Sequence, residues 1–402
     1  MIYFKLLLVL ALIVLLMRLK IGMGISLIIS SIIIGFLFFD VYYEIPAVFW
    51  NSISSYTTIK TVLIVYGVLL LSHIMKERQV DRMLGGLTQI FSNIKYAIIV
   101  PPVLIGLLPM PGGAMLPAAI IDSLGGPLKL SPEKKTFINY WFRHIWEYFW
   151  PLYPGLILTA SIMQVSIKRI MFYQFYLTIL AFIIGMIVIF TIKNNTASRA
   201  GQNIKEGLYA VLRSILPIIM IIGLIIFTPI SEEVVVLSIT FAYLLISGGS
   251  FKKKMQSIIK SFSADSMLLI AGVMIFKDFL IYSKTLDSIA VSMSGGQTAV
   301  FILLILMPAL IGFLTGINQA YVGIALPIIV PLFFSGQTID FTKLTLFYAS
   351  GFAGVLLSPV HLCLSLTKEY YKASWFKIYR ILIPAVLPIL LVPLIVFLLA
   401  NK

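Results

Sequence analysis

The chain has 402 residues, of which 60% are hydrophobic and 11% are charged. Soluble globular proteins contain roughly 45–50% apolar and about 25% charged residues, so this composition excludes a water-soluble enzyme and a disordered chain. The formal net charge of +15 indicates basic cytoplasmic loops of a membrane protein rather than a nucleic-acid partner. The apolar runs are continuous, whereas a transmembrane β-barrel needs alternating segments of about ten residues. We therefore predict an all-α polytopic membrane protein whose main partner is the lipid bilayer.

Apolar spans follow one another along the whole chain, each long enough for a membrane helix. The first begins behind a single Lys and lacks the small-residue cleavage site of a signal peptide, so we expect it to remain as a helix. The spans lie near 2–17, 21–39, 56–75, 96–122, 137–162, 166–192, 207–228, 232–247, 261–281, 298–334, 343–366 and 377–399.

Two spans, 96–122 and 298–334, are too long for one crossing and are interrupted by Gly and Pro. Each is either two crossings or a re-entrant hairpin, because irregular backbone at membrane depth must be covered by protein or water. Charge counting favours two hairpins and about ten transmembrane helices, since 20 of the 30 Lys and Arg then share one side. This topology predicts a multi-pass protein of the cytoplasmic membrane with both termini outside.

An internal repeat connects the two hairpins. Residues 102–114 align without gaps with residues 308–320, and six of the thirteen positions are identical, including a Pro and a Gly. The following helix repeats as well, with matching Tyr, Pro, Leu and Thr at an offset of 208. In the predicted topology the two units enter from opposite sides, so they form inverted repeats of the kind found in many secondary transporters.

The repeats divide the chain into five parts. We predict N-terminal scaffold helices over 1–50, connecting scaffold helices over 166–250 and a C-terminal helix over 377–402. The first repeat covers 51–165 and contains hairpin 96–122 and broken helix 137–162. The second repeat covers 251–376 and contains hairpin 298–334 and broken helix 343–366.

The hairpin tips are the first candidate binding sites. Proline removes backbone donors and glycine relaxes the backbone, so free N–H and C=O groups are expected at Gly112 and Gly113. The second tip adds a hydroxyl and two amides at Thr315, Asn318 and Gln319. Helix N-termini favour anions and exposed carbonyls favour cations such as Na⁺, while a structural kink without a ligand is the alternative.

The helix 137–162 carries two charges four residues apart. Arg143 and Glu147 share a helical face and can pair, and Glu147 lies near the membrane midplane. An ionisable residue there is a functional candidate, so Glu147 either carries a coupling proton or neutralises Arg143. Pro151 and Pro154 should break this helix near mid-depth.

The repeat-equivalent helix is expected to break at Ser358 and Pro359, beside His361. His361 can take a proton near neutral pH, or it can be a hydrogen-bonding core residue. The single cysteine, Cys363, excludes an internal disulfide and a cysteine-based metal site. We find no metal-ligand, nucleophile-elbow or phosphate-loop motif, so neither an enzyme nor ATP-driven transport by this chain alone is predicted.

Two Pro/Gly-rich hairpins, each followed by a proline-broken helix, resemble the ion-transporter superfamily of secondary transporters, which includes sodium/divalent-anion symporters, gluconate permeases, arsenite permeases and the large membrane subunits of TRAP transporters. Residues 109–117 and 357–367 look closest to an uncharacterised integral-membrane branch near the gluconate permeases. The symporters carry Ser-Asn-Thr at each tip, whereas residues 111–113 are Pro-Gly-Gly and residues 317–319 are Ile-Asn-Gln.

The resemblance implies a fixed scaffold, a moving part that carries substrate by an elevator motion, and a homodimer. It also implies substrate and cation sites at the tips and breaks. By position, these sites correspond to Gly112, Gly113, Asn318, Gln319, Pro151, Ser358 and Pro359.

We therefore predict a secondary active transporter for a small organic anion, coupled to H⁺ or Na⁺, without a cofactor or a bound metal. The anion is inferred from Arg143, Arg213 and the free helix N-termini, and Glu147 and His361 are the coupling candidates. A cation/proton antiporter without an organic substrate is the alternative.

Overall fold

A computed structural model describes residues 2–90, 93–110, 112–125, 128–192, 203–286, 300–335 and 338–400. Pro111 of the expected first tip, residues 298 and 299 of the expected second hairpin and most of the basic loop 193–206 lie outside these described residues. The described part is helical apart from one short antiparallel strand pair, β1 (Phe334–Ser335) and β2 (Thr338–Ile339).

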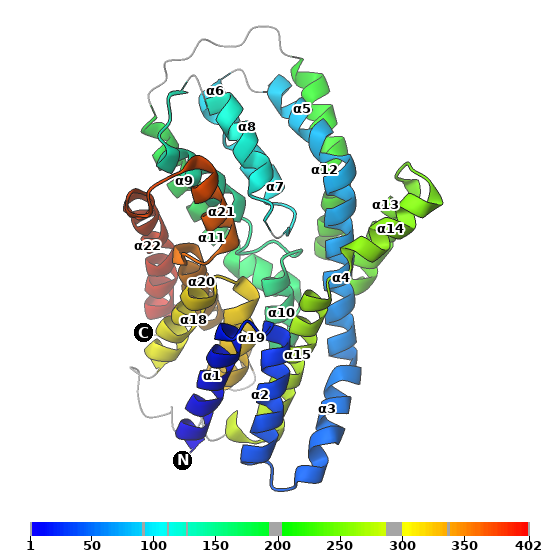
Figure 1. The fold of residues 1–402 in the computed structure, drawn as a ribbon, viewed down its shortest axis with the longest axis vertical. Helices are drawn as coiled ribbons and strands as arrows, with labels where there is room; N and C mark the ends of the chain where they lie inside the picture. Colours follow the sequence, from blue (N-terminus) through cyan, green and yellow to red (C-terminus); the bar gives the residue numbers. More distant parts are fainter. Residues whose placement is uncertain are drawn as a thin grey trace.

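The N-terminal helices pack against α15 at one end of the long axis (Figure 1). The elements of this region are α1 (Ile2–Arg18), α2 (Met23–Phe38), η1 (Tyr42–Glu44), α3 (Ile45–Ser54) and α15 (Ala264–Tyr282). Glycines bring α2 and α15 together, because a Cβ at Gly24 would lie 2.4 Å from the Leu268 carbonyl and one at Gly272 would lie 2.5 Å from the Gly24 carbonyl oxygen. Close approach through small residues is the usual way in which membrane helices associate.

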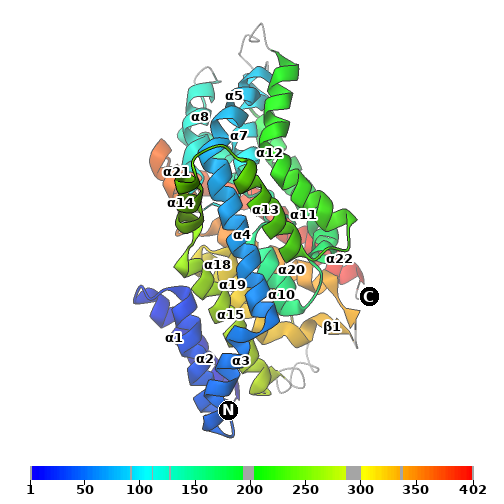
Figure 2. The same ribbon diagram turned by 90° about the vertical axis from the view of Figure 1, so that its right-hand side faces the viewer.

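A second group of helices runs along one side of the molecule (Figures 1 and 2). Helix α4 packs against α13 and α14, and α5 packs against α12. Their bounds are α4 (Tyr56–Arg78), α5 (Val80–Ile90), α12 (Ile204–Phe227), α13 (Glu232–Ile246) and α14 (Phe251–Ser261).

Both Gly/Pro-rich spans fold as helical hairpins. The first contains α6 (Ile94–Ala97), α7 (Val100–Ile105) and α8 (Met115–Gly125). The second contains the π-helical turn η3 (Ile302–Leu306), α18 (Met307–Thr315), α19 (Asn318–Ile329) and the 3₁₀ turn η4 (Val330–Phe333). Figure 1 shows α7 and α8 in the upper half of the molecule and α18 and α19 in the lower half. Re-entry from opposite membrane faces stays a prediction.

Both predicted broken helices are interrupted. The first consists of α9 (Pro132–His144) and α10 (Pro154–Met163), and the second of α20 (Phe341–Leu357) and α21 (Leu362–Tyr371). The flanking helices α11 (Ile167–Phe190) and α22 (Trp375–Ala400) pack against them. The first interruption begins well before Pro151 and Pro154, which were expected to cause it.

Equivalent contacts recur in the two repeats. A Cβ at Gly106 would lie 2.3 Å from the Arg143 carbonyl oxygen, and a Cβ at Gly312 would lie 2.2 Å from the Gly351 carbonyl oxygen. The two glycines correspond in the sequence repeat, and so do the two carbonyl-bearing residues. Each hairpin therefore meets the broken helix of its own repeat through the same glycine-to-carbonyl contact, which supports the predicted internal repeat.

A pair of equivalent tyrosines joins the repeats to each other. The Tyr140 hydroxyl donates to the Leu356 carbonyl at 3.1 Å, and the Tyr348 hydroxyl donates to the Glu147 carbonyl at 2.9 Å. Both carbonyls lie next to or within a helix break, where helical partners are missing. Each tyrosine thus binds backbone at the break of the opposite repeat.

The surface is that of a multi-pass membrane protein. In the described part, five helical segments are long and apolar enough to cross a membrane: Tyr56–Arg78, Ile167–Phe190, Ile204–Phe227, Phe341–Tyr371 and Trp375–Ala400. Large hydrophobic side chains are exposed on these and other helices, including Leu7, Phe172, Tyr209, Phe227 and Phe376. A surface of this kind is suited to contact with lipid. The predicted total of about ten spans stays a prediction.

Candidate functional site

Both hairpin tips and both helix breaks meet in the interior of the protein. At the end of α9, Arg143 donates to the Met110 carbonyl of the first tip at 2.7 Å. In the second break, His361 Nδ1 lies 2.6 Å from the Gly316 carbonyl oxygen of the second tip. The two breaks meet through Nε2 of His361 and Nε2 of His144, which are 3.1 Å apart. Four segments of irregular backbone therefore share one polar centre.

Aromatic side chains explain why the first break is so long. Trp146 and Trp150 donate their indole N–H groups to carbonyls of the first hairpin, those of Val103 at 2.8 Å and Leu107 at 3.1 Å. The Tyr153 hydroxyl donates to the Gly106 carbonyl of the same hairpin at 2.6 Å. These bonds satisfy carbonyls that α7 leaves open at its end. The sequence alone did not indicate this role of the tryptophans.

Arg143 is the most unusual charge in the site, because its side chain is only 3% exposed. Its Nη2 binds the Met110 carbonyl and its Nη1 donates to Cys363 Sγ at 3.2 Å, while Nε has no partner in the described part of the chain. Among the described residues, no carboxylate forms an ion pair with it. A Cβ at Gly113 would lie 2.8 Å from Nη2, so glycine is needed where the tip meets the guanidinium.

The predicted pairing of Arg143 with Glu147 on one helical face is not formed. Helix α9 ends at His144, so Glu147 no longer follows Arg143 by one helical turn. The Glu147 carboxylate turns instead toward Asn318, whose Nδ2 donates to Oε2 at 3.2 Å, and toward His144, whose Nε2 lies 3.6 Å from Oε1. Glu147 is buried, and its nearest polar partners come from the second tip and its own break.

Asn318 is the polar side chain of the second tip that reaches this centre. Its Nδ2 donates to Glu147 and to the Tyr348 hydroxyl at 3.1 Å, while its buried Oδ1 has no partner among the residues that the structure describes. A Cβ at Gly155 would lie 2.4 Å from this Oδ1, so a larger residue at the start of α10 would displace the amide. A buried acceptor without a donor is costly unless something else binds it.

Three helices begin at this centre without a side-chain cap. They are α10, α19 and α21, and none of their N-cap residues, Tyr153, Ile317 and His361, makes a capping bond to the first turn. Uncapped N-termini carry free backbone N–H groups and a partial positive charge, which favour an anion.

The structure brings four of the predicted site residues together: Arg143, Glu147, Asn318 and His361. Gly113 borders them through Arg143. Gly112 adopts the left-handed backbone conformation expected of a tip glycine, with φ +66°, and a Cβ there would contact only Leu362 and Leu366 of α21.

The remaining predicted residues lie at the edges of the site. The hydroxyls of Thr315 and Ser358 donate to the carbonyls of Ile311 at 2.7 Å and Phe313 at 2.6 Å. Gln319 is half-buried and Pro359 is exposed. Pro151 is buried beside the first break, where it lines a cavity of about 440 Å³ that is also lined by α4 and α13.

Sequence reasoning missed His144, Cys363 and Tyr348 as members of the site. The repeat offers no signal for His144, because the residue at its repeat-equivalent position 352 is Phe. Tyr348 had a signal, since it matches Tyr140 in the repeat. Cys363 was considered only as a cysteine without a second cysteine, and its partners come from another segment.

Comparisons with known proteins give a family and a likeness of fold. A family model described as a protein of unknown function (DUF401) matches residues 3–399. No curated protein matches the sequence. Among solved structures, the chain is similar to the crystal structure of the YdaH transporter of Alcanivorax borkumensis, which has an unusual topology. The TM-score is 0.62 at 12% identity over 90% of this chain and 88% of that chain, which is a likeness of fold.

Proposed function

We propose that the chain, which belongs to the DUF401 family of proteins of unknown function, is a secondary active transporter that moves a small organic anion across the cytoplasmic membrane. Its fold is similar to that of a transporter. The central polar site, built from two hairpin tips and two helix breaks, supports the proposal, because transporters place substrate and ion sites at discontinuous helices.

The buried guanidinium of Arg143 is the main reason to propose an anion as the substrate. A buried charge is costly unless it is paired, and the described partners of Arg143 are a carbonyl and a thiol. A carboxylate is the natural partner, since guanidinium and carboxylate form strong charge-assisted hydrogen bonds. Uncapped N-termini of α10, α19 and α21 add backbone donors with the same preference.

Coupling to H⁺ or Na⁺ is assigned to the opposite side of the same centre. Glu147 supplies a buried carboxylate and Asn318 supplies a free amide oxygen, which are oxygen ligands suited to a small cation. His361 connects this part of the site to the second tip. In the full proposal the two hairpins and the two broken helices move together against the remaining helices of a homodimer by the elevator motion of the ion-transporter superfamily.

A thermal-shift screen of the purified protein against organic anions, each with and without Na⁺, tests this proposal. A carboxylate that binds the folded state at about 100 times its Kd stabilises it by roughly 2.7 kcal/mol. We expect Asn318→Ala to weaken the additional stabilisation by Na⁺, because it removes the amide oxygen that is assigned to the cation. Asn51→Ala, at an exposed position of α3, is the matched control and should respond like the wild type. No stabilisation of the wild type by any anion would contradict the proposal.

A cation/proton antiporter is the second candidate, and the buried carboxylate of Glu147 favours it. If the chain is an anion symporter, Glu147→Gln is expected to abolish coupled transport, while stabilisation by the anion persists because Arg143 is intact. Glu77→Gln is the control, since Glu77 is an exposed residue of α4 that pairs with His73. If the wild type is stabilised by Na⁺ or by pH alone and no anion has an effect, the antiporter replaces the symporter.

A further inference from the structure

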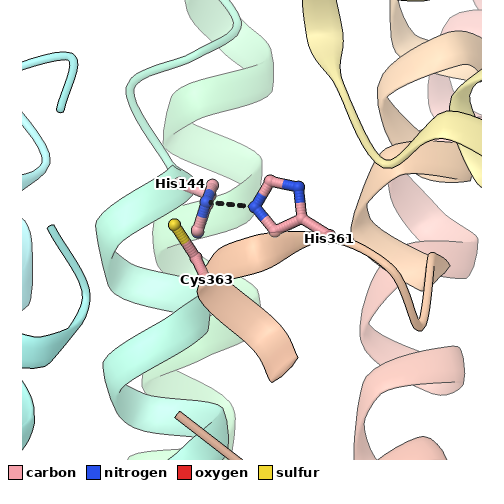
Figure 3. A group of neighbouring side chains, drawn as sticks. All are labelled: His144, His361 and Cys363. Atoms are coloured by element: carbon pink, nitrogen blue, oxygen red, sulfur yellow. Dashed lines mark hydrogen bonds between the residues drawn. The ribbon is translucent and has the colours of Figure 1, made fainter. Parts of the chain in front are cut away.

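Three side chains at the junction of the two breaks are arranged like ligands of a transition metal. His144 ends α9, His361 precedes α21, and Cys363 lies in the first turn of α21. Their donor atoms, two ring nitrogens and one sulfur, lie within 4.8 Å of one another. Figure 3 shows the two imidazole rings and the thiol pointing toward one another from two separate segments of the chain.

The hydrogen bonds of the two histidines fix how they face each other. Nδ1 of His144 lies 2.6 Å from the Tyr140 carbonyl oxygen, and Nδ1 of His361 lies 2.6 Å from the Gly316 carbonyl oxygen. A carbonyl only accepts, so both Nδ1 atoms must carry the hydrogen. Each neutral ring then presents the lone pair of Nε2, and these two lone pairs face each other across 3.1 Å. The contact is repulsive unless a cation lies between the two nitrogens.

The same arrangement is the usual outer shell of a metal site, in which each ligating histidine donates its other N–H to a backbone carbonyl. With Zn–N bonds of about 2.0–2.1 Å, two nitrogen ligands of one tetrahedral Zn²⁺ lie roughly 3.3 Å apart, close to the observed separation. Zn–S bonds of about 2.3 Å place sulfur roughly 3.6 Å from each nitrogen, so Cys363 has about 1 Å to close at most.

The neighbours of the three side chains complete a set of four donors. Glu147 Oε1 lies 3.6 Å from Nε2 of His144 and is the nearest carboxylate. On the other side, Arg143 Nη1 donates to Cys363 Sγ, a hydrogen bond that a metal-bound thiolate accepts. His361 is half-buried, and the neighbouring Val360 is exposed. Nitrogen, sulfur and oxygen donors together are typical of Zn²⁺ rather than of Na⁺ or Mg²⁺.

We propose that His144, His361 and Cys363, with Glu147 as the fourth ligand, form a binding site for one divalent d-block cation of the Zn²⁺ type. The site joins the two broken helices. It departs from the expectation that a single cysteine allows no cysteine-based metal site, because here two histidines from different segments would supply the other ligands. The site shares Glu147 and His361 with the proposed coupling site, but it is tested by binding to the purified protein and not by transport.

Cobalt titration of the chelator-treated full chain in detergent tests the site, because Co²⁺ occupies zinc sites and reports its ligands by absorption. We expect one Co²⁺ per chain, an intense thiolate-to-cobalt band in the near ultraviolet, and displacement of this band by Zn²⁺. Cys363→Ser should lose the charge-transfer band and retain only weak ligand-field absorption. Glu147→Gln should keep the charge-transfer band.

The histidine variants provide the second arm. His144→Gln and His361→Gln should each weaken Co²⁺ binding by more than the roughly 10–100-fold that loss of an outer-shell partner costs. His73→Gln is the matched control, because His73 lies on α4 and pairs with Glu77 at 3.3 Å, and its binding should equal that of the wild type. Thermal unfolding of each metal-free variant checks that it is folded.

Two results would overturn the metal site. One is a wild type that takes up no stoichiometric Co²⁺ or takes it up without a thiolate band, which would mean that the two histidines share a proton instead. The other is Co²⁺ binding that is unchanged in both His144→Gln and His361→Gln, or that is lost in His73→Gln. Failure of the anion screen leaves these measurements unaffected, so the two proposals fail separately.

Discussion

Arg143→Gln is expected to remove anion binding while the protein stays folded. Glutamine keeps a donor that can reach toward the Met110 carbonyl, but it carries no positive charge. Truncating one partner of a buried charged pair costs about 2–5 kcal/mol, which corresponds to a loss of affinity of roughly 30-fold to several thousand-fold. The measurement is the anion-dependent thermal shift, followed by uptake into proteoliposomes.

Two further variants make the Arg143 experiment specific. Arg143→Lys keeps the charge but loses the forked geometry of the guanidinium, so we expect partial retention of binding. Arg213→Gln removes a charge from an exposed position of α12 and should behave like the wild type. Wild-type anion binding by Arg143→Gln would remove this residue from the substrate site.

Gly312→Ala and Gly106→Ala are expected to destabilise the protein strongly for such small changes. Each new methyl group would lie only 2.2–2.3 Å from a backbone carbonyl oxygen, that of Gly351 for Gly312 and that of Arg143 for Gly106. Backbone cannot move aside as a flexible side chain can, and overpacking typically costs about 1–3 kcal/mol. We expect a lower thermal unfolding midpoint in detergent for both variants.

Gly223→Ala is the matched control for the two glycine variants. Gly223 lies in α12, and a Cβ there would meet open space, with nothing in the described part of the chain beyond its chain neighbours and the backbone of its own helix within 4 Å. Alanine at this position should therefore be neutral or stabilise by up to about 1 kcal/mol. If Gly312→Ala unfolds at the same temperature as Gly223→Ala, the close contact between α18 and α20 is wrong.

The architecture could be predicted from the sequence to the extent that it depends on local chemistry. Clusters of Gly and Pro indicated where the two hairpins and the two broken helices would lie, whereas single prolines did not, since α22 continues through three of them. The sequence repeat between residues 102–114 and 308–320 also indicated which glycines correspond. Helix ends were less predictable, because α9 stops at His144 where Trp146 and Trp150 find carbonyls on a distant hairpin.

The composition of the site was harder to predict for the same physical reason. Helical spacing put Arg143 and Glu147 on one face, but the early end of α9 turns the carboxylate toward Asn318 instead. Thr315 and Ser358 looked like free hydroxyls, yet each donates to a nearby helical carbonyl. The contacts of Glu147 with Asn318 and of His144 with His361 join segments 171 and 217 residues apart along the chain, and no local pattern records them.

The reciprocal tyrosines have a mechanical consequence. Because Tyr140 and Tyr348 each bind the backbone at the opposite break, sliding one broken helix past the other would cost two buried hydrogen bonds, about 1 kcal/mol each, and leave polar groups unsatisfied. The two tyrosines therefore connect the two repeats at their helix breaks, and the two broken helices would move together as one rigid body. The face toward α4 is looser, since it holds the cavity of about 440 Å³ beside Pro151. Movement of the two broken helices is therefore expected to need the least free energy along the face toward α4.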